Sequence, residues 1–287
     1  FYTTGTDTAL INLIKGAKTS IHLAASEDET SALCTWHIPQ AHYLESWGDA
    51  IAADGTVSPI QPMIDPLFGG LTPLELLARL ARYETVDGYE IVRRSFRSIA
   101  PKKDFEKGWR NFLHQGVFKT EAFVKAPPMS SEAIPAIATK INLSATHLEL
   151  CFALSPSTFD GRYANNGWMQ EMPDPISKLT WDNAALLSPK TARELSLKHG
   201  DVVTIAVNGR SVEAPAFVLP GTADYSVTLP LGYGRTKVGP VGQGAGFNAY
   251  PLRTGETLGF VVGATITKTG KTYVLATTQE HWTVAKH

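Results

Sequence analysis

The first half of the chain carries helix-like apolar stripes and one clear extended run. Apolar residues recur every three to four positions, the spacing of one helical face, over residues 7–17, 72–83, 87–99 and 104–115. Thr72, Pro73 and Glu75 form a typical helix start. Residues 20–25 alternate as a strand does, and the acidic stretch 27–30 follows as a loop. The pattern predicts a partial α/β domain followed by a helical connector.

The second half is built of short β-rich runs divided by Gly, Pro and Asn turns. The runs are HLELCFAL, DVVTIAV, SVEAPAFV, YSVTLPL, TLGFVVGATI and TYVLA. Asn208-Gly209 favours a hairpin between the second and third runs, because a type I′ turn needs positive φ at both central residues. Ser188-Pro189 begins a short helix. Short strands with few helices indicate a closed or nearly closed barrel.

The segment between the halves differs from both. Residues 126–138 hold three prolines and two serines without a regular period, which is typical of a linker. The predicted domains are therefore residues 1–137 and 138–287. Because the chain opens at Phe1 rather than Met, we expect it to be a piece of a longer polypeptide.

Charge and cysteine content narrow the possible partners. The 26 Lys and Arg residues nearly balance the 27 Asp and Glu residues, which argues against a nucleic-acid partner. No apolar run approaches the length of a membrane helix, so direct membrane insertion is not expected. Cys34 and Cys151 are too few, and too far apart, to hold an iron-sulfur cluster, and they are expected to be buried thiols, with a disulfide as the alternative.

Motifs for catalysis and metal binding are weak. The glycine cluster at residues 239–246 has no helix after it, so it does not match a dinucleotide fingerprint. A ligand-facing loop is the favoured interpretation, with a structural turn as the alternative. His37 and His42 do not share a helical face, and no G-x-S-x-G motif occurs. The sequence therefore assigns no catalytic residue and no metal ligand.

One long motif resembles a known family. Residues 166–183, NGWMQEMPDPISKLTWDN, resemble the N-x-W-L-Q-E-L-P-D-P-x-T-K-x-T-W-D-N pattern of molybdopterin oxidoreductases, and residues 187–195 and 198–203 continue the likeness. In that family this region is a six-stranded double-psi β-barrel over the pterin dinucleotide. The resemblance implies an α+β fold, with an N-terminal Rossmann-like α/β segment and helical connector before the barrel.

Residues 36–39, 42–49 and 239–248 make the resemblance more specific. They look like the molybdopterin-oxidoreductase-like iron-sulfur subunit of bacterial alternative complex III. That complex is a membrane-attached quinol oxidase with a periplasmic electron acceptor, and its molybdopterin-like region holds no molybdenum cofactor. The resemblance implies a scaffold at the periplasmic face of the inner membrane, partnered by the iron-sulfur region of its parent chain and by other subunits. Although the family is one of oxidoreductases, catalysis by this fragment alone is not expected.

The resemblance also gives an alternative in which the fragment supplies half of a cofactor pocket. In active relatives, the loop after the first barrel strand carries an arginine that meets the pterin, and here only Arg162 matches it. Asn166, Gln170, Gln243 and Asn248 stand where that family can place polar contacts to the dinucleotide. These five side chains would then bind molybdopterin guanine dinucleotide, unless they satisfy backbone groups of the barrel loops instead.

Overall fold

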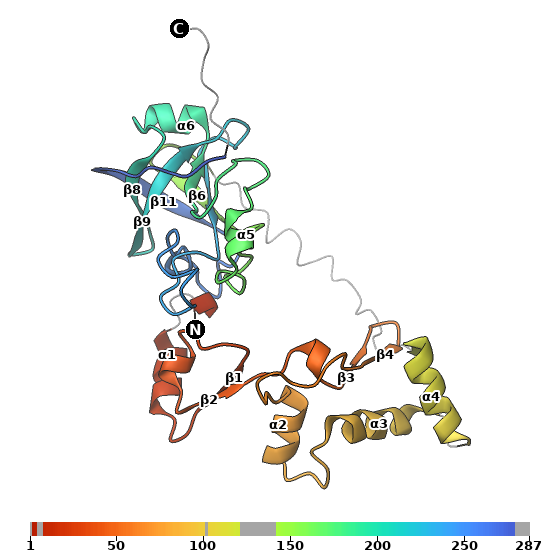
Figure 1. The fold of residues 1–287 in the computed structure, drawn as a ribbon. Helices are drawn as coiled ribbons and strands as arrows, with labels where there is room; N and C mark the ends of the chain where they lie inside the picture. Colours follow the sequence, from red (N-terminus) through yellow and green to blue (C-terminus); the bar gives the residue numbers. More distant parts are fainter. Residues whose placement is uncertain (1, 5–7, 101–102, 121–141, 279–287) are drawn as a thin grey trace, which may run out of the picture. The chain divides into compact units, whose positions relative to one another are not determined.

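The chain folds as two compact units in the computed structural model, which describes residues 2–4, 8–100, 103–120 and 142–278 (Figure 1). The barrel unit draws its described residues from Phe1–Lys18, Asp28–Leu33 and Lys140–His287. The helical unit draws its described residues from Thr19–Glu27 and Cys34–Thr139. The predicted linker and the boundary between residues 137 and 138 lie outside the described residues.

A closed β-barrel forms the core of the barrel unit. Among the described residues its strands are β6 (Leu148–Ala153), β7 (Ala185–Leu187), β8 (Asp201–Val207), β9 (Arg210–Val218), β10 (Ser226–Pro230) and β11 (Phe260–Thr272). They close in the order β10-β6-β11-β8-β9-β7. The β10–β6 and β7–β9 pairs are parallel and the other pairs are antiparallel. The expected mixed fold with a six-stranded double-psi barrel is confirmed.

The strands follow the alternation of apolar and polar residues. In β8, Val203, Ile205 and Val207 are buried in the barrel, and the residues between them are only partly buried. Asn208 and Gly209 have φ values of 50° and 73°, so the predicted tight turn joins β8 to β9.

One predicted strand is wrong and another was missed. TYVLA does not form a strand of its own, because β11 ends at Thr272 and the following residues leave the sheet. Leu275 packs instead with Leu179, Ala184 and Phe217 in a small cluster beside the barrel. The remaining place in the barrel is taken by β7, which is only three residues long.

Short helices complete the barrel unit. They are η1 (Tyr2–Thr4), α1 (Thr8–Gly16), η2 (Ser31–Leu33), α5 (Gly167–Glu171), α6 (Pro189–Glu194) and η4 (Tyr250–Leu252). Helix α6 starts as predicted, because the Ser188 hydroxyl accepts a hydrogen bond from the Thr191 N–H at 3.1 Å and Pro189 follows as the first helical residue.

The helical unit contains α2 (Pro73–Leu80), α3 (Gly88–Ile99) and α4 (Phe105–Gln115), all at predicted positions. Its strands are β1 (Ile21–Ala24), β2 (Trp36–Pro39), β3 (Gly48–Ile51), β4 (Thr56–Ile60) and β5 (Phe118–Lys119), with η3 (Tyr43–Glu45) between β2 and β3. Strands β1 and β2 pair in parallel, and β3, β4 and β5 form an antiparallel sheet. Its core is Val57, Val92, Phe96, Trp109 and Phe112.

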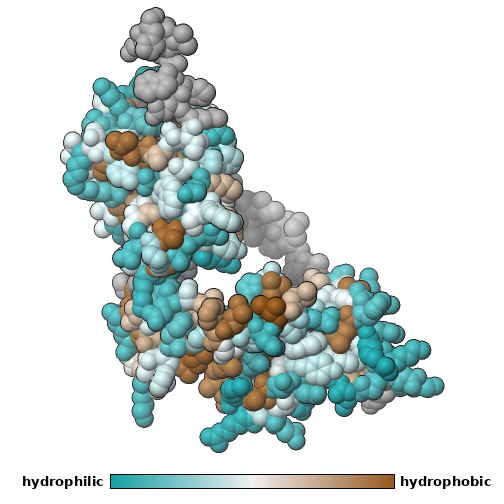
Figure 2. All heavy atoms as spheres, viewed as in Figure 1, coloured by the Kyte–Doolittle hydropathy of each residue, from teal (hydrophilic) through white to brown (hydrophobic). Residues whose placement is uncertain are grey.

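Large apolar side chains are exposed on the helical unit, part of the brown surface in Figure 2. Among them are Met63, Ile64, Leu67, Phe68, Leu77 and Leu80, and the Tyr83 side chain is exposed as well. Leu77, Leu80 and Tyr83 follow one another at a spacing of three residues, so one side of α2 and of the turn after it carries an apolar stripe outside the core. The periodicity that predicted α2 is therefore only partly used by packing within this unit.

Candidate functional site

Two of the five predicted cofactor-binding residues lie together in an open depression on the barrel unit. The depression has a volume of about 560 Å³ and is lined by Arg162, Tyr163, Asn165, Asn166, Gly167 and Trp168. The Trp168 side chain is 87% exposed. Gln170, Gln243 and Asn248 are not among the residues that line it.

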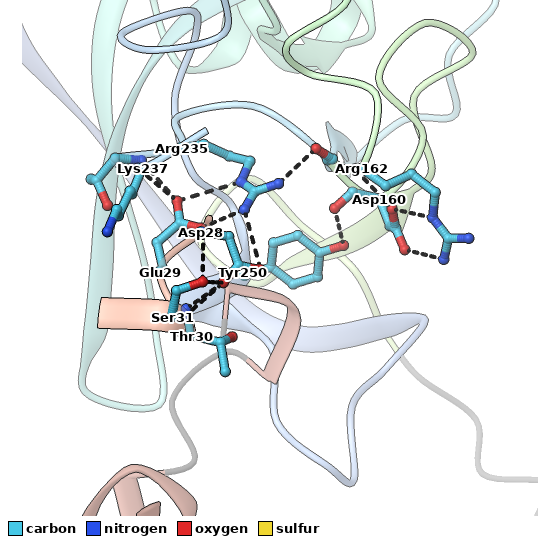
Figure 3. Close-up of polar contacts among 11 residues, drawn as sticks. Asp28, Glu29, Thr30, Ser31, Asp160, Arg162, Arg235, Lys237 and Tyr250 are labelled. Carbon is cyan, nitrogen blue, oxygen red and sulfur yellow. Dashed lines mark hydrogen bonds and ion pairs between the residues drawn. The ribbon is translucent and has the colours of Figure 1, made fainter. Parts of the chain in front are cut away.

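Arg162 is paired with an acid two residues earlier. Its Nε donates to Asp160 Oδ1 at 3.0 Å, and its Nη2 donates to Asp160 Oδ2 at 2.8 Å (Figure 3). The hydrogen bond from Arg162 holds the pKa of Asp160 below its usual range. The Asp160 backbone carbonyl also accepts a hydrogen bond from the buried Tyr250 hydroxyl at 3.0 Å. The guanidinium charge is therefore balanced within the loop, although the side chain faces solvent.

The two predicted asparagines accept hydrogen bonds from nearby backbone N–H groups. Asn166 Oδ1 accepts a hydrogen bond from the Met169 N–H at 3.2 Å and so caps α5. Asn248 Oδ1 accepts from the Tyr250 N–H at 3.0 Å, a turn closed by its own side chain. Both side chains therefore have a structural role that needs no ligand.

The two predicted glutamines have opposite environments. Gln170 is only 1% exposed, and its Nε2 donates to the Ala164 carbonyl at 3.0 Å. Its Oε1 is buried without a hydrogen-bond partner among the described residues. Gln243 is exposed on the glycine loop, residues 239–248. The structure does not bring these two side chains into the depression.

The glycine loop is held by the end of the family-like motif. The buried Asn183 donates through Nδ2 to the carbonyls of Pro230 (2.7 Å) and Phe247 (3.0 Å), and its Oδ1 accepts from the Phe247 N–H at 2.8 Å. Asp182 Oδ1 accepts from the Gly246 N–H at 3.2 Å. Burial raises the pKa of Asp182. The motif therefore fastens the loop to the barrel.

The same loop packs closely against Ala164 and Asn165, at the edge of the depression. A Cβ on Gly242 would lie 2.4 Å from the Ala164 carbonyl oxygen, so only glycine allows this approach. Asn165 Oδ1 accepts from the Val241 N–H at 3.1 Å. These contacts support the structural-turn alternative for the glycine cluster, with Gln243 and Gly244 left exposed at its tip.

A second polar cluster was not predicted. Arg235 Nη2 donates to Glu29 Oε2 at 2.5 Å, and its Nε donates to Oε1 at 3.4 Å (Figure 3). Both side chains are only 9% exposed. The N–H groups of Thr236 (2.9 Å) and Lys237 (3.1 Å) also donate to Glu29 Oε1. Burial would raise the pKa of Glu29, but the hydrogen bonds outweigh it and lower the pKa to about 2.

Tyr2 completes this cluster. Its hydroxyl donates to the Tyr233 carbonyl, and its ring packs edge-on against Tyr250 at 4.8 Å between centroids. The Arg235 guanidinium lies over the Tyr2 ring, 4.9 Å from its centroid. The Tyr2–Tyr233 and Glu29–Arg235 contacts could not be found from sequence, because 231 and 206 positions separate their members.

Other candidate groups have ordinary environments in the described part of the chain. Cys34 and Cys151 are both free thiols, and burial raises the pKa of Cys151. His42 Nδ1 accepts from the Leu44 N–H at 3.3 Å, which caps η3. Within the described residues, no three His, Cys, Asp or Glu side chains gather as a metal site would need, and no helix has the length and apolar character to cross a membrane.

Comparisons with known proteins show a likeness of fold. No protein-family model matches the chain, and no curated protein matches it. It is similar to the solved structure of acetylene hydratase from Pelobacter acetylenicus, with a TM-score of 0.56 and 15% identity over 85% of this chain and 42% of that one. The chain thus spans less than half of that protein. A computationally designed protein, msDPBB_sym2, matches 34% of this chain and 91% of its own at 19% identity, with a TM-score of 0.20, from which we draw nothing.

Proposed function

We propose that this chain is part of a molybdopterin-oxidoreductase-like subunit of a respiratory, quinol-oxidising complex, and that it is a non-catalytic scaffold without a cofactor of its own. The resemblance of residues 166–183 to the molybdopterin oxidoreductases and the double-psi barrel support the family assignment. The proposed subunit is that of alternative complex III, at the periplasmic face of the inner membrane.

The observation that carries the scaffold proposal is the bonding of the predicted cofactor-binding side chains. Arg162 is paired with Asp160, while Asn166 and Asn248 cap backbone turns and Gln170 is buried against a carbonyl. A dinucleotide that used the same atoms would have to replace these internal hydrogen bonds, and such an exchange gains little. The family-like motif is thus used to build the barrel.

The exposed apolar surface of the helical unit supports a role in assembly. Met63, Leu67 and Phe68 are each more than half exposed on one loop, and Leu77 and Leu80 are exposed on α2. Apolar surface of this kind is typical of protein interfaces. The proposed partners are the iron-sulfur region of the parent chain and other subunits of the complex.

The depression favours the alternative function, half of a molybdopterin guanine dinucleotide pocket. Trp168 and Tyr163 expose aromatic rings beside the Arg162 cation, a combination that can stack a planar base and attract a phosphate. Arg162 and Asn166 fit this group in position, and Gln170 Oε1 is a buried acceptor still without a partner among the described residues.

Metal and pterin analysis of the longer protein that carries this chain separates the two functions. Plasma mass spectrometry and fluorescence after pterin oxidation should find neither molybdenum nor tungsten and no stoichiometric pterin. Stoichiometric metal and pterin would overturn the scaffold proposal. A titration of this chain with guanosine diphosphate gives a second readout, the fluorescence of Trp168. The scaffold proposal predicts no saturable change. A saturable change that is lost in Trp168→Phe would support the dinucleotide pocket instead.

A further inference from the structure

The donors around Glu29 form a compact array that belongs to the barrel. Arg235 and the N–H groups of Thr236 and Lys237 come from one stretch of the loop after β10. All three converge on the two oxygens of a single carboxylate. One guanidinium and two successive backbone amides are the donors that proteins use to bind carboxylate and phosphate groups.

The array is oriented by contacts that do not involve Glu29. Arg235 Nη1 donates to the Gly161 carbonyl at 2.9 Å, and the guanidinium lies over the Tyr2 ring. The Arg235 side chain is buried to nine-tenths, so its charge is poorly screened by water. Removal of the Glu29 side chain would therefore leave an oriented, cationic group of donors rather than a collapsed loop.

The carboxylate that fills the array comes from a distant part of the chain. Glu29 lies in Asp28–Leu33, a short segment of the barrel unit whose neighbours on both sides, Thr19–Glu27 and the residues from Cys34 onward, belong to the helical unit. Asp28 reinforces it, because its carboxylate lies 4.0 Å from Arg235 Nη2. The occupant and the donors are thus separate in sequence.

We propose that Arg235 and the amides of Thr236 and Lys237 form an oxyanion-binding site, which takes a carboxylate or phosphate group and which Glu29 occupies as an internal ligand. While Glu29 is in place, an external anion must compete with a tethered carboxylate at high effective concentration. The site opens to external anions when Glu29 is absent or withdrawn. This inference does not depend on the proposed function.

The test is an anion titration of the full chain and its Glu29→Ala variant. Sodium phosphate or sodium acetate replaces sodium chloride at constant ionic strength, and the thermal midpoint and the amide shifts of Thr236 and Lys237 are followed. In the variant, phosphate or acetate should produce a saturable rise of the thermal midpoint. The apparent affinity for the anion should be at least about tenfold above that of the unmodified chain. A response to acetate alone would define a carboxylate site, and a stronger response to phosphate a phosphate site.

Two control variants make the result specific. Glu213→Ala removes an exposed ion pair with Lys271 and should respond as the unmodified chain does. Glu29→Ala combined with Arg235→Gln should lose the response. If Glu29→Ala is unfolded in chloride, the same titration reads the folded fraction by circular dichroism, which phosphate or acetate should restore. A Glu29→Ala response no larger than that of Glu213→Ala, with unmoved amides, would overturn the proposal.

Discussion

At the scale of single residues, the environment of Glu29 couples its charge to the stability of the barrel unit. Its pKa is lowered to about 2 in the folded chain, from an ordinary value of 4.5. A group whose pKa is depressed by folding contributes its full stability above the unfolded pKa and loses it as pH falls toward the folded pKa. The window for Glu29 is therefore from about pH 4.5 down to about pH 2.

Replacement of Glu29 by Gln should remove this pH dependence. The unmodified chain should lose on the order of 2 kcal/mol of unfolding free energy between pH 5 and pH 3 from this group. Because the other carboxylates are unchanged, the difference between the two proteins isolates Glu29. Urea denaturation of both proteins at pH 5, 4 and 3 measures it, and parallel pH slopes would contradict the assignment.

Local spacing decides which residue contacts could be predicted. The Thr72 cap and the Asn208-Gly209 turn depend on neighbours within three positions, and both were predicted. The Arg162–Asp160 pair was also within reach, since only two positions separate its members. The Arg235–Glu29 pair was not, because only the fold brings the acidic loop to the barrel.

At the scale of elements, α2 owes its beginning to a reciprocal cap. The buried Thr72 hydroxyl accepts from the Glu75 N–H at 3.0 Å, and Glu75 Oε2 accepts from the Thr72 N–H at 2.9 Å. Thr72→Ala should lower the free energy of unfolding by about 1 kcal/mol. The Glu75 N–H loses its acceptor, and the Glu75 carboxylate that accepts from the Thr72 N–H loses the support of the hydroxyl. Hydrogen exchange in the first turn of α2 should accelerate by about fivefold. Thr72→Ser keeps the hydroxyl and should stay near the unmodified rate; equal acceleration in both variants would refute the role of the hydroxyl.

The length of β7 explains why this strand was missed. A run must repeat its alternation over at least about four residues to be distinguished from a loop, and β7 has only three. TYVLA has the composition of a strand, but its apolar Leu275 is buried in a loop contact instead. The burial of Leu275 agrees with the composition of the run, whereas Tyr273 and Val274 are exposed.

At the scale of the whole molecule, each unit has a hydrophobic core of its own. Leu229 is fully buried in the barrel core, and Phe96 is buried in the core of the helical unit. Leu229→Ala should destabilise the barrel unit by about 2–5 kcal/mol, and Phe96→Ala should destabilise the helical unit by about 3–5 kcal/mol. Hydrogen exchange should accelerate mainly in β6 and β8 for the first variant and mainly in α3 and α4 for the second. Equal acceleration in both units by either variant would show that they unfold as one.

The barrel itself was accessible from sequence because a long motif resembled a known family. The division of the chain was harder, since a single boundary cannot describe a barrel unit that also includes residues from Phe1–Lys18 and Asp28–Leu33. Membership in a compact unit is set by contacts between distant positions, which a pass along the chain does not show. The five candidate site residues were chosen by position in a motif, and their bonding partners came only with the structure.

The anchoring of Tyr2 and Glu29 has a consequence for the order in which the protein is made. A ribosome releases both residues long before Arg235, which follows Glu29 by 206 positions. Until Arg235 has been made, Glu29 and the Tyr2 ring lack this partner. A shortened gene that starts at residue 142 would still encode all six barrel strands, yet its product would carry Arg235 without the aromatic ring and the carboxylate that enclose it.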